Sequence, residues 1–429
     1  MRKNFLYSTV TLIVISSLSK ILSFIVRIFL ARHLSESAMN LYSVALPTLV
    51  FLIALAQMGI PSALSKYIAQ NQNPMNGILS SLILSLVSNV VLIVLFILMI
   101  PFLSNQLFHD DLVKEILKSM IFMIPMVTFS GLLKAILQGK QHHIIACFSQ
   151  IFEELFRLVY LIILFSQPII SSIELARIAM FSVFVGECGS SLFMLIFILF
   201  YKKPIRSYQH DLRKEHFKEI LSSSIPMTSA RLLGSFTYFM EPLVFFSLSN
   251  NLLFQNAYGN FNGYVLPLLT MPSFVSVTLA NMLLPTFVYE KKHNNLSRAK
   301  KIFYLISLIC FTISFCCAFV TFFFPKEILQ FFYHTTRGSE QLQLTSIPFV
   351  FYSLQPVLSS LLHALDQSRK AFIDTALGCA VRLLILPISV PLLGHHALIF
   401  AITLSMFITT GMHALRVIKS LQVLTHSSG

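Results

Sequence analysis

Long apolar runs alternate with short polar connectors along almost the whole chain. A run of about 20 apolar residues is long enough to cross the hydrocarbon core of a bilayer as an α-helix. Twelve such segments are predicted, at about residues 6–31, 41–64, 78–101, 117–138, 144–166, 177–201, 219–247, 259–288, 302–324, 342–364, 371–392 and 397–418. The pattern predicts an all-α polytopic membrane protein, and no connector is long enough to hold a soluble domain.

Basic residues favour one side of the predicted membrane. With the N-terminus inside, most lysines and arginines of the connectors fall on the inner side, whereas the outer connectors hold Arg32, Lys114, Lys118, Lys326 and Arg337. Positive charge collects in the cytoplasmic loops of membrane proteins. We therefore expect a multi-pass protein of the cell (plasma) membrane with both termini cytoplasmic. No small-residue cleavage site follows the first apolar run, so we expect that helix to be retained.

The two halves of the pattern resemble each other. Spans four and ten each open with an Ile-Pro pair, and twenty residues separate both Leu137 from Arg157 and Leu362 from Arg382. Two parallel six-helix lobes with a central cavity between them are the arrangement that such a repeat predicts. The predicted parts are an N-terminal lobe at 1–201, a basic cytoplasmic linker at 202–218 and a C-terminal lobe at 219–429. Prolines inside spans two and eight indicate bent or broken helices, with a static kink as the alternative.

Composition narrows the class of protein further. Hydrophobic residues make up 56% of the chain and charged residues 11%, where a soluble domain carries roughly a quarter charged residues. The net charge of +14 collects in the connectors, so no nucleic-acid partner is expected. The six cysteines fall in apolar spans and are interpreted as packing residues, without a metal site. Because the sequence holds no Walker-type phosphate loop, HExxH or GxSxG motif, we expect neither an enzyme nor a cofactor.

Four of the basic residues within predicted spans are candidates for binding an anion, because an ionised group there is costly unless it faces a partner or a wet cavity. Lys20 and Arg27 are seven residues apart, hence on one stripe of the first helix, and no acidic residue accompanies them there. Arg231 and Arg382 lie in spans seven and eleven. Arginine binds phosphate in bidentate fashion and lysine acts as a point charge. The four residues predict a cationic cavity suited to a phosphate-bearing substrate.

Acidic residues enter the spans as well. Glu153 and Glu154 precede Arg157 by about one helical turn, and Glu187 and Glu241 lie in spans six and seven. Such carboxylates can exchange protons or hold a coupling cation, so transport coupled to H+, Na+ or the membrane potential is one interpretation. Internal pairing at i+3 and i+4 spacing, with a purely structural role for Arg157, is the other.

Several segments in order resemble the polysaccharide-export and stage V sporulation protein B family, which belongs to the multidrug/oligosaccharidyl-lipid/polysaccharide exporter (MOP) superfamily. They are Ser19-Lys20-Ile21-Leu22-Ser23-Phe24, Gly59-Ile60-Pro61-Ser62-Ala63-Leu64, Leu137-Gln138-Gly139-Lys140, Ser149 to Arg157, and Leu266-Pro267 with Met271-Pro272 and Leu284-Pro285. The resemblance runs along most of the chain. It implies two six-helix lobes in a V shape, alternating access, and a flippase that moves polyprenyl-pyrophosphate-linked sugars to the outer leaflet.

The resemblance also bears on single residues. It implies a substrate role for Lys20, which matches a cationic position of helix one in the related lipid II flippases, whereas Arg27 lies one residue from another such position. Ser23 stands where a glycine is common, and many relatives have fourteen helices instead of twelve. The missing pair favours a flippase for sugar repeat units, or a lipid-tail path through other helices.

The leading hypothesis is a flippase for lipid-linked oligosaccharide or cell-wall precursor, in polysaccharide or cell-envelope biosynthesis. Its expected partners are the lipid-linked sugar and membrane lipids, with a polymerase or another envelope-synthesis protein as a candidate, and we expect a monomer. A cation-coupled multidrug exporter on the same scaffold is the first alternative. A membrane glycosyltransferase is the second, although the chain has no sizeable outer loop for catalytic groups. The third is a non-transporting scaffold in envelope assembly, for which the charges at Lys20 and Arg27 would be dispensable.

Overall fold

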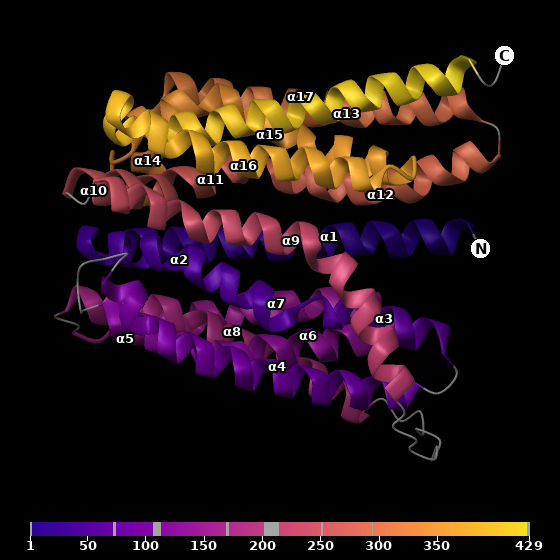
Figure 1. Cartoon of the computed structure of the whole chain (residues 1–429), viewed down its shortest axis with the longest axis horizontal. Helices are drawn as coiled ribbons and strands as arrows, with labels where there is room; N and C mark the ends of the chain where they lie inside the picture. Colours follow the sequence, from indigo (N-terminus) through magenta and orange to yellow (C-terminus); the bar gives the residue numbers. More distant parts are fainter. Residues whose placement is uncertain are drawn as a thin grey trace. The chain divides into compact units, whose positions relative to one another are not determined.

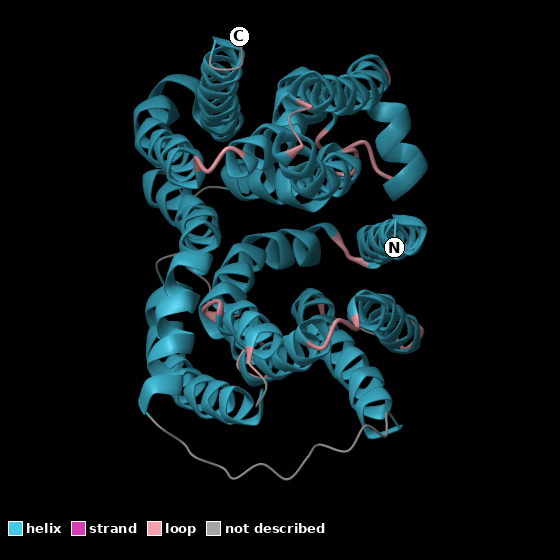
Figure 2. Cartoon of the chain, turned by 90° about the vertical axis from the view of Figure 1, so that its right-hand side faces the viewer, coloured by secondary structure: helices cyan, strands magenta, loops and turns pink. Residues whose placement is uncertain are grey.

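Helices make up all the regular structure of the described residues, in agreement with the all-α prediction (Figure 2). The computed structural model describes residues 2–71, 74–105, 113–168, 171–200, 214–249, 252–293 and 295–426. The chain divides into two compact units, Met1–Phe239 and Met240–Gly429. The boundary falls inside α9 (Lys214–Leu248), and the predicted linker at 202–218 lies mostly outside the described residues. The predicted lobe boundaries therefore stay a prediction.

The N-terminal unit is built from antiparallel helices that lie side by side (Figure 1). In order they are α1 (Arg2–His33), α2 (Glu36–Gln57), α3 (Ile60–Gln70), α4 (Pro74–Leu103), α5 (Val113–Ser119), α6 (Met123–Gly139), α7 (His143–Phe165) and α8 (Ser172–Phe200), followed by most of α9. Helix α7 packs against both α1 and α8, and α2 packs against α6 and α8. The centre of this unit is therefore lined by α1, α2, α7 and α8.

The C-terminal unit follows the end of α9. Its elements are α10 (Leu252–Asn260), the π-helix η2 (Phe261–Val265), α11 (Leu266–Thr270), α12 (Ser273–Lys292), α13 (Leu296–Phe323), α14 (Pro325–Tyr333), α15 (Ser339–Ala364), α16 (Ser368–Leu393), the 3-10 turn η3 (Gly394–His396) and α17 (Ala397–His426). Helix α15 packs against α12, α13 and α17, and α16 packs against α17. Helix α15 is therefore the centre of this unit.

Each predicted span coincides with a helix or with a broken helix of the structure. Within the described residues, eight helical segments are long and apolar enough to cross a membrane, or nine if one bent pair counts as a span. One of these segments, Ser368–Val423, contains both α16 and α17. Helices α7 and α9 are the remaining two; α7 carries three charged residues, Glu153, Glu154 and Arg157, and α9 is rich in Ser and Thr. The structure is thus consistent with about twelve spans.

The distribution of polarity is that of a membrane protein. On α4 the buried residues include Ser80, Ser81 and Asn89, whereas Leu86 and Leu98 are exposed. Small and polar side chains let membrane helices approach closely and bond to each other, and lipid covers the apolar outer face. Exposed apolar surface of this extent is typical of contact with a membrane.

Two spans are broken near their prolines, as predicted. Helix α2 ends at Gln57, and the next two residues, Met58 and Gly59, have φ angles of 40° and 67° before α3 begins with Pro61 in its first turn. In the C-terminal unit the segment Leu252–Thr270 is bent by 48° relative to α12, with Met271 and Pro272 at the break. The first break places Gln57 at the end of a helix, where its side chain is available to other helices.

Replacing Gly59 with alanine should destabilise the protein, because a Cβ atom there would collide with Thr228 Oγ1 and lie 2.7 Å from the Ser224 carbonyl oxygen of α9. The left-handed φ adds about 1–2 kcal/mol for a non-glycine residue, and overpacking adds about 1–3 kcal/mol. The measurement is the unfolding midpoint of the purified protein in detergent. Gly234→Ala, on the same α9 helix with open space around its Cβ position, is the control and should be neutral. Equal midpoints for the two variants would contradict the close contact.

Candidate functional site

Arg157 is held at the centre of the N-terminal unit by groups from three helices. Its Nε donates to Ser182 Oγ of α8 at 3.0 Å, and its Nη2 donates to Tyr42 Oη of α2 at 3.5 Å. On its own helix, Nη1 lies 3.9 Å from Glu154 Oε2. The ion pair within α7 therefore exists as the i+3 spacing predicts. It is long, and the shorter contacts of Arg157 run to other helices.

A second arginine reaches the same tyrosine from α1. The guanidinium carbon of Arg27 lies 5.2 Å from the centroid of the Tyr42 ring, within the range of a cation–π interaction. Tyr42 is 1% exposed. Its buried ring contacts Arg27, and its hydroxyl accepts a hydrogen bond from Arg157. The structure thus brings together Arg27 and Arg157, which the sequence places on separate helices and in separate roles.

Charges of both signs surround Glu153 of α7. Glu153 lies in the electrostatic field of Lys134, Glu154, Arg157 and Lys20. Glu187 of α8 in turn lies in the field of Glu153, Lys134 and Glu154. We call Lys20, Lys134, Glu153, Glu154, Arg157 and Glu187 the α7 charge cluster. Lys20 has no acidic residue on its own helix, and α7 supplies one.

Glycines on α8 allow this cluster to form. A Cβ atom at Gly186 would lie 2.9 Å from the Glu153 carbonyl oxygen, and one at Gly189 would collide with the Phe156 ring. Small residues let the backbones of two membrane helices approach closely. Glu187, beside Gly186, is therefore carried close to the carboxylates of α7.

Arg231 bonds to the broken end of α2. Its Nη1 donates to Gln57 Oε1 at 2.9 Å, and Gln57 Nε2 donates to the Val127 carbonyl oxygen at 3.4 Å. The Arg231 side chain is exposed, and its partner carries no charge. The positive charge of Arg231 is therefore not neutralised by this contact, although its position is fixed.

Arg382 and Glu241 form an ion pair within the C-terminal unit. Arg382 Nη2 of α16 contacts Glu241 Oε2 of α9, and the Glu241 side chain is 1% exposed. The sequence pattern favours different roles for these two residues, pyrophosphate binding for Arg382 and coupling for Glu241. In the structure the buried carboxylate is the neighbour of the guanidinium, so Arg382 can bind another anion only by leaving Glu241.

Several residues that contact these charged groups carry no signal in the sequence. Tyr42 and Ser182 look like ordinary residues of apolar spans, and Lys134 lies near the end of a predicted span, where a lysine can reach the membrane surface. Gln57 carries no signal apart from its place before the Gly-Ile-Pro break. The most informative signal in the sequence is the presence of three charged residues in one span, because buried charges need partners from other helices.

The family model for polysaccharide biosynthesis proteins matches residues 5–290, well over half of the chain. The chain belongs to the polysaccharide biosynthesis protein family. Among its relatives, stage V sporulation protein B of Bacillus subtilis (strain 168) is 27% identical, with 98% of this chain and 85% of that protein aligned. Sporulation protein YkvU of the same organism is 22% identical, with 99% and 97% aligned.

Solved structures show the fold of this family member. An inward-facing multidrug resistance MATE family transporter of the MOP superfamily superposes with a TM-score of 0.76 at 16% identity, over 98% of this chain and 100% of that chain. A MOP superfamily transporter from Pyrococcus furiosus gives a TM-score of 0.65 at 14% identity, over 97% and 96%. The family model confirms the predicted family, and the superpositions confirm the predicted all-helical, multi-pass membrane fold.

Proposed function

We propose that this protein is a flippase that moves a polyprenyl-pyrophosphate-linked oligosaccharide or cell-wall precursor from the inner to the outer leaflet by alternating access. It would act in the cell membrane with both termini in the cytoplasm, because the basic connectors favour that orientation. Its partners would be the lipid-linked sugar, membrane lipids and envelope-synthesis proteins that use the product. We infer that it has no enzymatic activity of its own.

The observation that carries this proposal is the meeting of two arginines on one buried tyrosine. Arg27 faces the Tyr42 ring and Arg157 the Tyr42 hydroxyl, on helices long enough to cross a bilayer. A pyrophosphate faces a prohibitive barrier in hydrocarbon, and fixed cationic groups lower that barrier. Lys20, exposed on the same helix as Arg27, adds a third positive group that a phosphate could approach.

The four cations of the predicted pyrophosphate site differ in what they already contact. Lys20 is exposed, Arg27 faces a ring, Arg231 bonds to a neutral amide, and Arg382 pairs with a buried carboxylate. A phosphate that bound Arg382 would first have to displace this buried carboxylate. We therefore propose Arg382 as a positioning residue and Lys20, Arg27 and Arg231 as the groups that contact pyrophosphate.

A cation-coupled exporter is the second candidate, and one observation favours it. Glu153, Glu154 and Glu187 lie in one another's electrostatic field, and carboxylates that interact in this way can share a proton or a cation. In the flippase proposal the same three residues would couple the return step to H+ or Na+. In the exporter they would bind the drug as well.

Charge removal at Lys20 or Arg27 should slow transport strongly. In proteoliposomes with a fluorescent polyprenyl-pyrophosphate sugar, Lys20→Ala and Arg27→Ala should each lower the rate of leaflet exchange by about 10–100-fold, the effect of one lost charged hydrogen bond. Lys20→Arg should retain most of the rate, because it keeps the charge. Lys326→Ala, an exposed lysine of α14, is the matched control and should be silent.

The outcomes separate the site from the function. No exchange of any polyprenyl-pyrophosphate sugar by the wild type, combined with export of cationic drugs, would replace the flippase by the exporter. Wild-type exchange that both alanine variants retain would remove Lys20 and Arg27 from the site and leave the function intact.

A further inference from the structure

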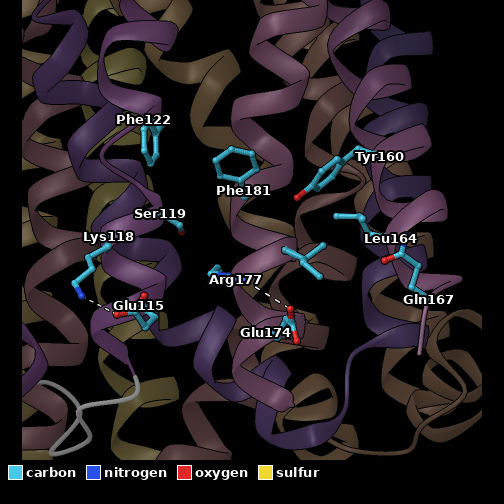
Figure 3. A pocket seen from close by; sticks show the side chains of 11 residues that line it. Glu115, Lys118, Ser119, Phe122, Tyr160, Leu164, Gln167, Glu174, Arg177 and Phe181 are labelled. Atoms are coloured by element: carbon cyan, nitrogen blue, oxygen red, sulfur yellow. Dashed lines mark hydrogen bonds and ion pairs between the residues drawn. The ribbon is translucent and has the colours of Figure 1, made fainter. Parts of the chain in front are cut away.

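A groove of about 450 Å³ opens at one end of the N-terminal unit (Figure 3). Its walls come from α5 with the turn before α6, from the last turns of α7 and from the first turns of α8. This volume lies within the range of about 300–1,000 Å³ that is typical of small-molecule sites. All of its walls belong to a single compact unit.

Three aromatic rings line one end of the groove. Phe181 lies in the middle, with its ring centroid 6.3 Å from that of Phe122 and 6.2 Å from that of Tyr160. Figure 3 shows the Tyr160 hydroxyl pointing toward the centre of the groove. Phe122 is 60% exposed, so a ligand can reach this surface. Such rings offer apolar faces, and the tyrosine adds a polar tip.

Charged groups of both signs line the other end. Lys118 Nζ lies 2.7 Å from Glu115 Oε1, and Arg177 Nη2 lies 3.6 Å from Glu174 Oε1. Gln167 is on the opposite wall (Figure 3). The two cations and two carboxylates cancel, so this end does not select for an anion. Instead it presents donors and acceptors side by side, together with an amide that supplies both.

A neutral polyol matches this combination. Each sugar hydroxyl both donates and accepts a hydrogen bond, which suits alternating carboxylates, ammonium groups and an amide. The apolar face of a sugar ring suits the exposed aromatic rings. A bare diphosphate matches less well, because the local carboxylates repel it and already occupy the two cations.

The places of the lining residues in the sequence indicate on which side of the membrane the groove lies. In the proposed orientation the start of α5, the end of α7 and the start of α8 all lie at the outer end of their spans. A ligand in this groove would therefore sit at the level of the outer leaflet. The substrate of a flippase reaches that leaflet as the product of transport.

We propose that this groove binds the sugar head group of the lipid-linked product in the outer leaflet. The carboxylates of Glu115 and Glu174 and the amide of Gln167 contact hydroxyl groups, and Tyr160 and Phe181 pack against the ring. This site for release rests on the proposed function and is distinct from the pyrophosphate groups at Lys20 and Arg27. It gives the outer end of the protein a preference for sugar.

The test is photolabelling of the full-length protein in lipid nanodiscs. The probe is polyprenyl-diphosphate N-acetylglucosamine with a diazirine on the sugar, and labelled peptides are mapped by mass spectrometry. We expect labels within 115–122 and 160–181, and competition by the same lipid without the diazirine. Gln167→Ala and Glu174→Gln should each lower the labelling by about fivefold, the effect of one lost hydrogen bond. Glu340→Gln, an exposed carboxylate of α15, should leave it unchanged.

Three results would overturn the proposal. One is labelling elsewhere only, and another is labelling that neither groove variant reduces. The third is equal competition by sugar-free polyprenyl diphosphate or by phosphatidylglycerol, which would make the groove a general lipid site. Leaflet exchange measured on the same preparations separates this inference from the function. Leaflet exchange without labelling of the groove would contradict only the proposed release site. Labelling of the groove without leaflet exchange would contradict only the proposed flippase function.

Discussion

Replacing Glu241 with alanine should cost about 3–5 kcal/mol of folding stability, the usual effect of leaving one partner of a buried ion pair uncompensated. The Glu241 side chain is 1% exposed and that of Arg382 is 21% exposed, so water cannot fully solvate the charge that remains. Arg382→Ala should lose stability for the same reason. The double variant Glu241→Leu, Arg382→Met should lose much less than the two single changes together, because no charge is left buried.

The measurement is a double-mutant cycle on unfolding midpoints in detergent, built from Glu241→Leu, Arg382→Met and the double variant, with Glu340→Gln as a control for loss of an exposed carboxylate. A coupling energy near zero would show that Glu241 contributes by packing and not by pairing with Arg382. The result also bears on transport. If the pair is strong, Arg382 remains with Glu241, and its substitution should affect exchange only as far as it affects folding.

The positions of the helices could be predicted well because hydropathy alone determines them. In a chain of this composition, runs of about 20 apolar residues form membrane-spanning helices. The prolines of spans two and eight mark the breaks at Met58–Gly59 and Met271–Pro272. The spacing of Glu154 and Arg157 likewise predicts their contact on α7, because it depends only on helix geometry.

Contacts between helices could not be predicted in the same way. The bond from Arg157 to Tyr42 joins residues 115 positions apart, and that from Arg231 to Gln57 joins residues 174 apart. A single sequence says that a buried charge needs a partner and does not say which helix provides it. For example, the sequence pattern assigns Arg382 to pyrophosphate binding and Glu241 to coupling, whereas the structure pairs the two side chains.

A buried cluster in the C-terminal unit is a further contact between helices that the sequence pattern does not predict. Asp374 of α16 is fully buried, and Arg416 Nε of α17 donates to its two oxygens at 2.7 and 2.9 Å. His413 Nδ1 lies 3.0 Å from Oδ2. In the sequence Arg416 counts only as a basic residue at the inner end of the last span, where it supports the orientation. The structure gives it a second task, the attachment of α17 to α16.

Asp374→Ala should therefore weaken the attachment of α17 to α16 and lower the stability by about 3–5 kcal/mol, as for other broken buried ion pairs. Asp374→Asn should cost less, because the amide oxygen still accepts one bond from Arg416 while the charge is lost. The measurement is the unfolding midpoint, together with proteolysis at the ends of α16 and α17. Asp366→Asn is the matched control: this exposed residue lies in the turn before α16 with φ at 59°, a conformation that asparagine tolerates.

The outcome distinguishes a structural role from a role in transport. The end of α17 has further anchors, since Gln367 Nε2 donates to Ser420 Oγ at 2.9 Å and Lys300 Nζ donates to the Leu421 carbonyl oxygen at 3.0 Å. If Asp374 only fastens α17, exchange by Asp374→Asn should fall in proportion to the folded fraction. Normal stability combined with lost exchange would contradict this assignment and place Asp374 among the coupling groups. Because carboxylates that bind a transported cation need their charge, whereas structural ones need their hydrogen bonds, the asparagine variant separates the two roles.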